Sequence, residues 1–223
     1  MAASFGSLEV GARQKAFMYE IENYLKAHPK CSIVNLGCGL DQTAERFDNG
    51  ECRIYNIDFP DVIDIRNRMI PPKDERHQNI ATDLNDLSWM EKVARDDGSV
   101  FMASGVFYYF TMEEMEKLIN GMASYFHGGI LVFDIAGKKT VQMIIKGWIR
   151  EMNIEGVRTS FYVNDVDKQI TPWLRNAKAS SRGYMTGYFE LKEFKSISGF
   201  FRFLSKVGDH MMNMKIVRID FDR

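Results

Sequence analysis

Three features of this 223-residue sequence predict an α/β fold built on a mostly parallel sheet. Short apolar runs and helical stretches alternate from Ile33 to Ile135, which is the order of parallel βαβ units. The run from Gly129 to Ile135 (GILVFDI) is almost continuously apolar, as expected for a strand covered on both faces. The stretch from Met214 to Phe221 alternates apolar and polar residues and predicts one further strand.

Length and composition favour a single domain over residues 1–223 with an inserted cap, since one sizeable core suffices for this length. A net charge of -1 gives no electrostatic reason to expect nucleic acid or an anionic membrane as a partner. The three cysteines lack metal-site spacing, and no window approaches 18 apolar residues. We therefore expect no metal site, no membrane span and a cytoplasmic location.

The first 31 residues are expected to form an N-terminal helix. Helix-forming residues run from Ser7 to Ala27, and Phe17, Ile21 and Leu25 recur on one face. Pro29 then ends the helix.

Residues 32–140 are expected to form the core that binds the ligand. Apolar runs predict strands at Ile33–Leu36, Arg53–Ile57, Gln78–Ala81 and Ser99–Ala103. Helical turns or short helices are expected at Gln42–Phe47, Asp61–Met69 and Trp89–Ala94. In the second of these, Val62, Ile65 and Met69 share one face. Thr111-x-x-Glu114 is a capping box that predicts the start of a longer helix.

The last third of the sequence lacks the regular alternation of strands and helices. Residues 141–190 mix helical and polar loop sequence and predict a cap over the substrate. Trp148 and Trp173 are candidate substrate contacts there, although packing within the cap is the alternative. Residues 191–223 are expected to form a C-terminal helix, Lys192–Lys206 with an interruption at Gly199, followed by the final strand.

A pair of glycines after the first strand marks a nucleoside site. Gly37 and Gly39 let the backbone approach a ligand closely, and Asp58 ends the next strand as a partner for a ribose diol. The dinucleotide fingerprint requires a third glycine where Gln42 stands, which disfavours NAD and FAD. Gly137-Lys138-Lys139-Thr140 lacks the earlier glycine of a phosphate-binding loop. A nucleoside without a pyrophosphate is therefore expected.

Five segments between Ser7 and Ile135 carry a resemblance to a known family: LGCGLD, YNIDFPDVI, the Asp83-Leu84 pair, SGVFYYF and GILVFDI. They resemble the class I S-adenosylmethionine methyltransferases, and specifically the leucine carboxyl methyltransferase family with its polyketide O-methyltransferase branch, of the TcmP type. The resemblance implies a Rossmann-like, mostly parallel sheet with an antiparallel last strand and helices on both faces. It also implies S-adenosylmethionine as the cofactor.

The resemblance also implies roles for particular residues. Gly37 and Gly39 would line the methionine and ribose portions, and Asp58 would accept hydrogen bonds from the ribose hydroxyls. Asp83 and the backbone of Leu84 would contact the adenine.

The methionine end is implied in the same way. Arg13 would bind the methionine carboxylate, with Lys15 as a second candidate. Tyr109 would orient the substrate or pack against the methionine tail, with core packing as the alternative. Ser104 stands near the cofactor, where family members usually carry an acid.

The expected reaction is transfer of a methyl group to an oxygen of a small molecule. A carboxylate acceptor is already ionised at pH 7, whereas a phenol requires a base. The four histidines are scattered outside the strand-end motifs, and the absence of an obvious base there favours a carboxylate acceptor. Among the four, His210 is the best candidate for a base. Ser104 and a short N terminus also allow a cofactor-binding protein without catalysis, and an NAD-linked reductase is disfavoured by Gln42.

Overall fold

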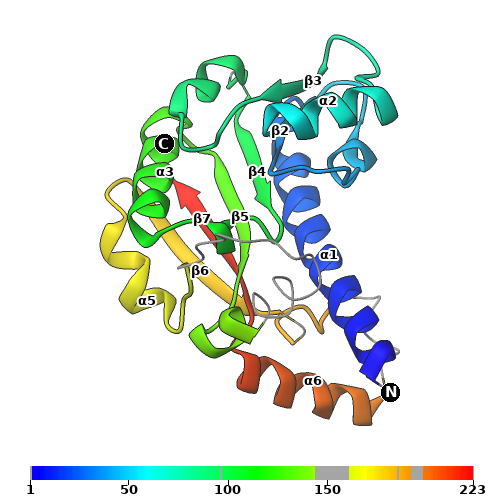
Figure 1. Cartoon of the computed structure of the whole chain (residues 1–223), viewed down its shortest axis with the longest axis vertical. Helices are drawn as coiled ribbons and strands as arrows, with labels where there is room; N and C mark the ends of the chain where they lie inside the picture. Colours follow the sequence, from blue (N-terminus) through cyan, green and yellow to red (C-terminus); the bar gives the residue numbers. More distant parts are fainter. Residues whose placement is uncertain (1, 96, 144–160, 185, 192–197, 223) are drawn as a thin grey trace.

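The chain folds around one seven-stranded sheet (Figure 1). This is seen in a computed structural model that describes residues 2–95, 97–143, 161–184, 186–191 and 198–222. The strand order is β3-β2-β1-β4-β5-β7-β6. The strands are β1 Ser32–Leu36, β2 Arg53–Asp58, β3 His77–Ala81, β4 Ser99–Ala103, β5 Ile130–Ile135, β6 Ala177–Gly183 and β7 Lys215–Phe221.

Strands β1 to β5 pair in parallel, and β7 runs antiparallel to both of its neighbours, β5 and β6. This confirms the expected mostly parallel sheet with an antiparallel last strand. All six expected strands are present, with ends that differ by at most one residue from those expected.

Strand β6 was not expected, because its segment was assigned to a cap of helix and polar loop. Its sequence, AKASSRG, is polar and largely exposed at the sheet edge. Backbone pairing with β7 over its whole length creates the strand, so no apolar pattern marks it.

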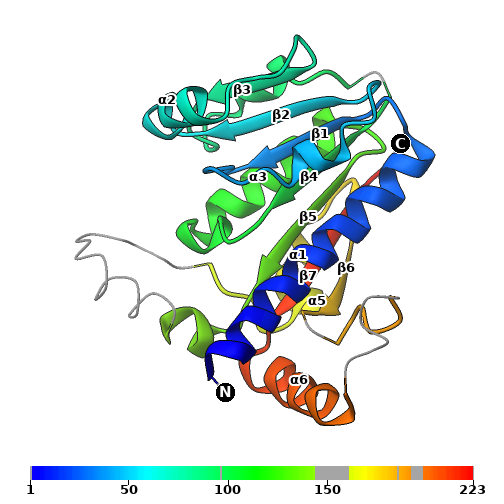
Figure 2. The same cartoon turned by 90° about the vertical axis from the view of Figure 1, so that its right-hand side faces the viewer.

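Helices cover both faces of the sheet. They are α1 Ala2–Ala27, α2 Pro60–Met69, α3 Met112–Tyr125, α5 Val166–Gln169 and α6 Gly199–Met212, with 3-10 turns η1 Ala44–Phe47, η2 Leu87–Lys92, η3 Phe107–Tyr109 and η4 Thr171–Trp173. Residues 138–143 are also helical. Figure 2 shows α1 running diagonally across the sheet. Its Phe17 and Ile21 are buried with β1 and β4 residues in one core, while α3 packs in a second core.

The capping box at the start of α3 is confirmed. The Thr111 hydroxyl accepts from the Glu114 backbone N–H (3.1 Å), and the Glu114 carboxylate accepts from the Thr111 N–H (2.7 Å). Helix α3 buries the apolar residues Met115, Leu118 and Met122.

The prediction for the buried face of α2 is wrong. Ile65 and Met69 are exposed, and the helix buries Ile63 and Arg66 instead. Arg66 can occupy the buried face because polar acceptors surround its guanidinium, and a hydrophobic pattern does not reveal this.

The C-terminal helix also differs from the expectation. Gly199 is the first residue of α6, not an interruption, and the Ser198 side chain caps it. The helix continues past Lys206 to Met212. Residues 192–197, where the helix was expected to begin, lie outside the described ranges.

Among the described residues, no helix combines the length and apolar character that crossing a membrane requires. The carboxyl ends of the parallel strands share one edge of the sheet, where ligands bind in folds of this kind. Expected site residues lie at or just after the ends of four of these strands: Gly37 and Gly39 after β1, Asp58 at the end of β2, Asp83 and Leu84 after β3, and Ser104 after β4.

Candidate functional site

The turn after β1 has a backbone that requires glycine. Gly37 and Gly39 have φ of 61° and 49°, in the left-handed region that other residues rarely adopt. A Cβ on Gly37 would lie 2.5 Å from Cγ2 of Val106. The turn after β1 therefore packs directly against the segment that follows β4.

Asp58 is held in place at the end of β2 by two backbone N–H groups. Its Oδ2 accepts from Gly39 N (2.8 Å), and its Oδ1 accepts from Phe59 N (2.8 Å). Each carboxylate oxygen has a second lone pair, so both can still accept from ligand hydroxyls. Asp58 thus joins the glycine turn to β2 and presents an oriented carboxylate.

A cavity of about 170 Å³ lies beside this carboxylate; we call it the Asp58 pocket. It brings together five of the predicted site residues, Gly37, Asp58, Asp83, Leu84 and Tyr109. The other lining residues are Phe59, Thr82, Asn85, Val106, Phe110 and Glu114. Apolar walls with a few carboxylates suit a flat base and a ribose.

The acids of the Asp58 pocket are linked through Asn85. Asp83 Oδ1 accepts from the Asn85 backbone N–H (2.9 Å), and the Asn85 amide donates to Glu114 Oε1 (3.5 Å). Glu114 was recognised in the sequence only as a capping residue. Its capping position is also what places it at the pocket.

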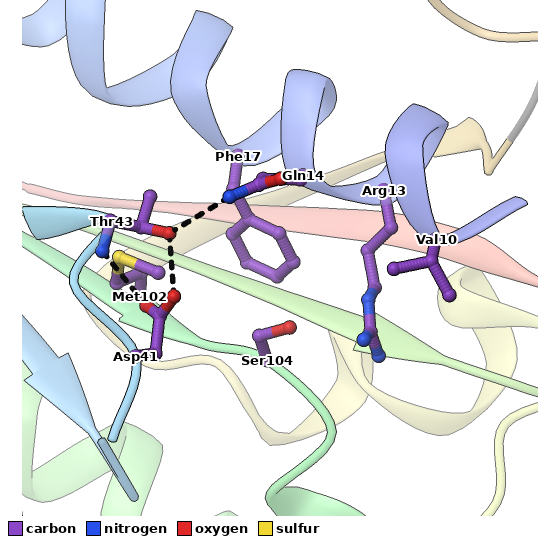
Figure 3. A pocket seen from close by; sticks show the side chains of 8 residues that line it. All are labelled: Val10, Arg13, Gln14, Phe17, Asp41, Thr43, Met102 and Ser104. Carbon is purple, nitrogen blue, oxygen red and sulfur yellow. Dashed lines mark hydrogen bonds between the residues drawn. The ribbon is translucent and has the colours of Figure 1, made fainter. Parts of the chain in front are cut away.

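A second cavity, of about 180 Å³, lies under α1; we call it the Arg13 pocket (Figure 3). It contains the predicted residues Arg13 and Ser104. The other lining residues are Val10, Gln14, Phe17, Asp41, Thr43 and Met102. Figure 3 shows Ser104 between Arg13 on one side and Asp41 on the other.

Arg13 is paired with Asp134, a buried acid near the end of β5. Arg13 Nη1 lies 3.4 Å from Asp134 Oδ2, and the same carboxylate accepts from Gly105 N (2.6 Å) and the Tyr108 hydroxyl (3.1 Å). Burial opposes the charge on Arg13, but Tyr184 and Asp134 outweigh it and raise the pKa of the guanidinium. Arg13 is therefore a permanent cation at the pocket.

The opposite wall of the Arg13 pocket is acidic. Asp41 Oδ1 accepts from the Thr43 hydroxyl (2.8 Å), and Oδ2 accepts from the Asn35 amide (3.2 Å). Gln14 of α1 donates to the same Thr43 hydroxyl (3.4 Å). A pocket with a guanidinium on one wall and a carboxylate on the other suits a zwitterionic group.

Several expected residues lie elsewhere. Lys15 is exposed and lines neither pocket, and Gly39 lies in the turn without lining either. Tyr109 lies in the Asp58 pocket, away from Arg13. His210 is exposed on α6 and lines neither pocket.

Trp173 lines neither pocket, and its expected substrate role stays a prediction. It packs against the core on the α3 face, and its carbonyl accepts from the Asn120 amide (3.1 Å). Trp173 also precedes β6, whose first residue pairs with the end of β7 at the amino-terminal edge of the parallel strands. This edge is opposite the two pockets. Trp148 lies outside the described residues.

Sequence reasoning missed Asp134, Asp41 and Arg66. Asp134 had a usable signal, because it is the one charged residue in the apolar run GILVFDI. Arg66 had none, since α2 carries charges on several sides. Within the described ranges, no three His, Cys, Asp or Glu residues are grouped as metal ligands.

Solved structures share this fold. A Thermobifida fusca YX protein, solved as a candidate methyltransferase, matches with a TM-score of 0.66 and 11% identity, over 99% of this chain and 82% of its own. The N-methyltransferase NodS from Bradyrhizobium japonicum WM9, in complex with S-adenosyl-L-homocysteine, matches with a TM-score of 0.52 and 16% identity, over 92% and 87% of the two chains. These likenesses establish a methyltransferase fold.

Sequence comparison is more specific. The tetracenomycin polyketide synthesis O-methyltransferase TcmP of Streptomyces glaucescens is 28% identical over 112 residues, which are 50% of this chain. The match spans 41% of that relative's length. The family model for leucine carboxyl methyltransferase matches residues 7–123, more than half of the chain. The chain therefore belongs to the leucine carboxyl methyltransferase family.

Proposed function

We propose that this protein binds S-adenosylmethionine across the two pockets and transfers its methyl group to an oxygen of a small molecule. The observation that carries the proposal is the grouping of Asp58, Asp83 and Leu84 in one pocket, with Arg13 and Ser104 in the neighbouring one. The family match and the complex of NodS with S-adenosyl-L-homocysteine support the same cofactor.

The chemistry of each pocket fits one end of this cofactor. In the Asp58 pocket, the carboxylate would accept from the ribose hydroxyls, and the apolar walls would hold the adenine. In the Arg13 pocket, the guanidinium would bind the methionine carboxylate, and Asp41 would face its ammonium group. Tyr109 would pack against the nucleoside, not the methionine tail.

A carboxylate is the favoured acceptor. The bound cofactor supplies an electrophilic methyl group, and the protein must hold an oxygen in line with it and exclude water. All four histidines are among the described residues, and none of them lines either pocket. Burial and the neighbouring Asp134 raise the pKa of Tyr108, and burial raises the pKa of Tyr109, so neither phenol is a ready base near pH 7. An acceptor that is already ionised avoids this need.

The test is methyl transfer from radiolabelled S-adenosylmethionine to a panel of aromatic acids, phenols and carboxy-terminal peptides. We expect labelled product from an acid, and the label should be released by mild base because a methyl ester hydrolyses. Label that survives base would indicate an ether and a hydroxyl acceptor. The Arg68→Met protein, altered at an exposed position of α2, is prepared and assayed in parallel as a control for effects of purification and assay.

The second candidate is a cofactor-binding protein without catalysis. Ser104 favours it, because a hydroxyl stands in the Arg13 pocket where the related family usually has an acid. Binding of S-adenosyl-L-homocysteine with no transfer to any acceptor in the panel would favour this alternative over the enzyme.

A further inference from the structure

A fully buried arginine lies behind the glycine turn. Arg66 of α2 donates from Nη1 to Gly39 O (2.9 Å) and to Asp41 O (2.8 Å), and from Nη2 to Glu45 Oε1 (2.5 Å). Its side chain is 0% exposed and lines neither pocket. Arg66 thus touches the turn without facing the space that a ligand would occupy.

These hydrogen bonds hold the turn through its carbonyls, whereas Asp58 holds it through an N–H group. The Gly39 N–H is bound by Asp58 (2.8 Å), and the Gly39 carbonyl is bound by Arg66. The Asp41 carbonyl is held by the same Nη1 atom, while the Asp41 side chain lines the Arg13 pocket. One guanidinium therefore sets the backbone between the two pockets.

Stability alone is a poor explanation for this arrangement. A buried ion pair commonly contributes no more than apolar packing of the same volume, because both charges lose their hydration. Here the network is also incomplete. Arg66 Nε and Glu45 Oε2 are buried without a hydrogen-bond partner among the described residues. An apolar pair at positions 66 and 45 would avoid both of these penalties.

We propose that Arg66 is a positioning residue for the cofactor turn. It holds the carbonyls of Gly39 and Asp41 so that the turn has its binding conformation before the ligand arrives. A loop that is ordered in the free protein binds more tightly, because less conformational entropy is lost on binding. Arg66 therefore sets the affinity for S-adenosylmethionine without contacting it. The inference rests on the proposed cofactor site.

The test compares Arg66→Met with the matched control Arg68→Met, which replaces an exposed arginine of the same helix. Titration calorimetry with S-adenosyl-L-homocysteine is run at 25 °C, and circular dichroism verifies that each protein is folded at this temperature. We expect Arg66→Met to raise the Kd by about tenfold or more, and the control to leave it within about twofold.

A mutant cycle separates positioning from general destabilisation. Asp58→Ala frees the N–H of Gly39 and Arg66→Met frees its carbonyl, so both variants loosen the same residue and their effects on Kd should not add. If Arg66 only stabilised the fold, its replacement would lower the melting temperature and leave the Kd of the folded protein unchanged.

The outcomes are distinct. If the wild-type protein does not bind S-adenosyl-L-homocysteine, the proposed cofactor site is wrong. If it binds and folded Arg66→Met binds within about twofold as well, the role of Arg66 is overturned. If Arg66→Met does not fold, the Kd of Arg66→Lys is measured instead, because one ammonium group cannot reproduce the fork of hydrogen bonds that the guanidinium makes. We expect that variant to bind at least about threefold more weakly, and an unchanged Kd would overturn the proposal.

Discussion

Single residues at this site act through hydrogen bonds that involve the backbone. Asp58 orients the glycine turn through Gly39 N, and Asp134 orients the segment after β4 through Gly105 N. Both acids stand near the ends of parallel strands, and both have oxygen lone pairs beyond those bonds. The same carboxylates that shape the turns are thus available to orient a ligand or to hold Arg13.

Gly37 provides a test at the residue scale. In Gly37→Ala, the added methyl group would meet Val106 and the residue would have to keep a positive φ. We expect weaker binding of S-adenosyl-L-homocysteine and a loss of about 1 to 3 kcal/mol in the free energy of unfolding. Calorimetry and urea unfolding measure the two effects.

The double variant Gly37→Ala/Val106→Ala separates the two causes. It removes the methyl contact with the valine side chain but keeps the strained φ, so it should recover part of the lost stability. A single variant as stable as wild type would contradict the close packing of the two turns.

Cys38, between the two glycines, is expected to be unreactive. Burial raises the pKa of its thiol to about 12, so the reactive thiolate is scarce at pH 8. Cys31 is buried in the same way, with its pKa also raised to about 12. In a titration with a chromogenic disulfide reagent, the thiols should react only after unfolding in guanidinium. Rapid reaction of Cys38 in the native protein would show that the turn opens.

At the scale of elements, local patterns predicted what local forces determine. The Thr111–Glu114 capping box and the apolar run of β5 are each marked by residues close together in sequence, and both were found as expected. Strand β6 and the buried face of α2 were missed because tertiary partners define them. A polar edge strand needs β7 beside it, and a buried Arg66 needs the turn carbonyls that accept its hydrogen bonds.

Asp48 links two elements and provides a prediction for pH. Asp48 directly follows η1. Its carboxylate accepts hydrogen bonds from Arg76 Nη1 (2.7 Å) and Lys73 Nζ (3.2 Å), two residues of the segment that leads into β3. The hydrogen bond from Arg76 is the main reason that the pKa of Asp48 is lowered. A lowered folded-state pKa stabilises the fold above the unfolded-state pKa of about 4, and this stability is lost as the pH falls further.

Asp48→Asn should therefore lower the free energy of unfolding at pH 7 by about 1 to 3 kcal/mol. Its difference from wild type should shrink as the pH falls below about 4, because Asp48 of the wild-type protein then becomes protonated in the unfolded chain while it stays ionised in the folded protein. Urea unfolding at pH 7 and pH 3 measures this, with Asp64→Asn on the exposed side of α2 as the control. An equal difference at both pH values would contradict the ion-pair explanation.

At the scale of the whole molecule, the edge of the sheet assembles the site. Residues from α1 and from the turns after four strands meet there, although Arg13 and Asp134 are 121 positions apart. The glycine pair and Asp58 were predictable because each has a fixed place relative to a strand. The partners Asp134, Asp41 and Arg66 were not, because only the folded sheet brings them to the same place. Trp173 was expected in a cap over the substrate, but its segment leads into β6, which begins at the opposite edge of the sheet.

Binding of S-adenosyl-L-homocysteine to the wild-type protein and to Asp58→Ala tests the central claim most directly. Calorimetry should show one site with a Kd in the micromolar range or tighter, and the loss of the oriented carboxylate should weaken binding by about 1 to 3 kcal/mol. No heat with the wild-type protein, or an unchanged affinity in Asp58→Ala, would contradict the placement of the cofactor across the two pockets.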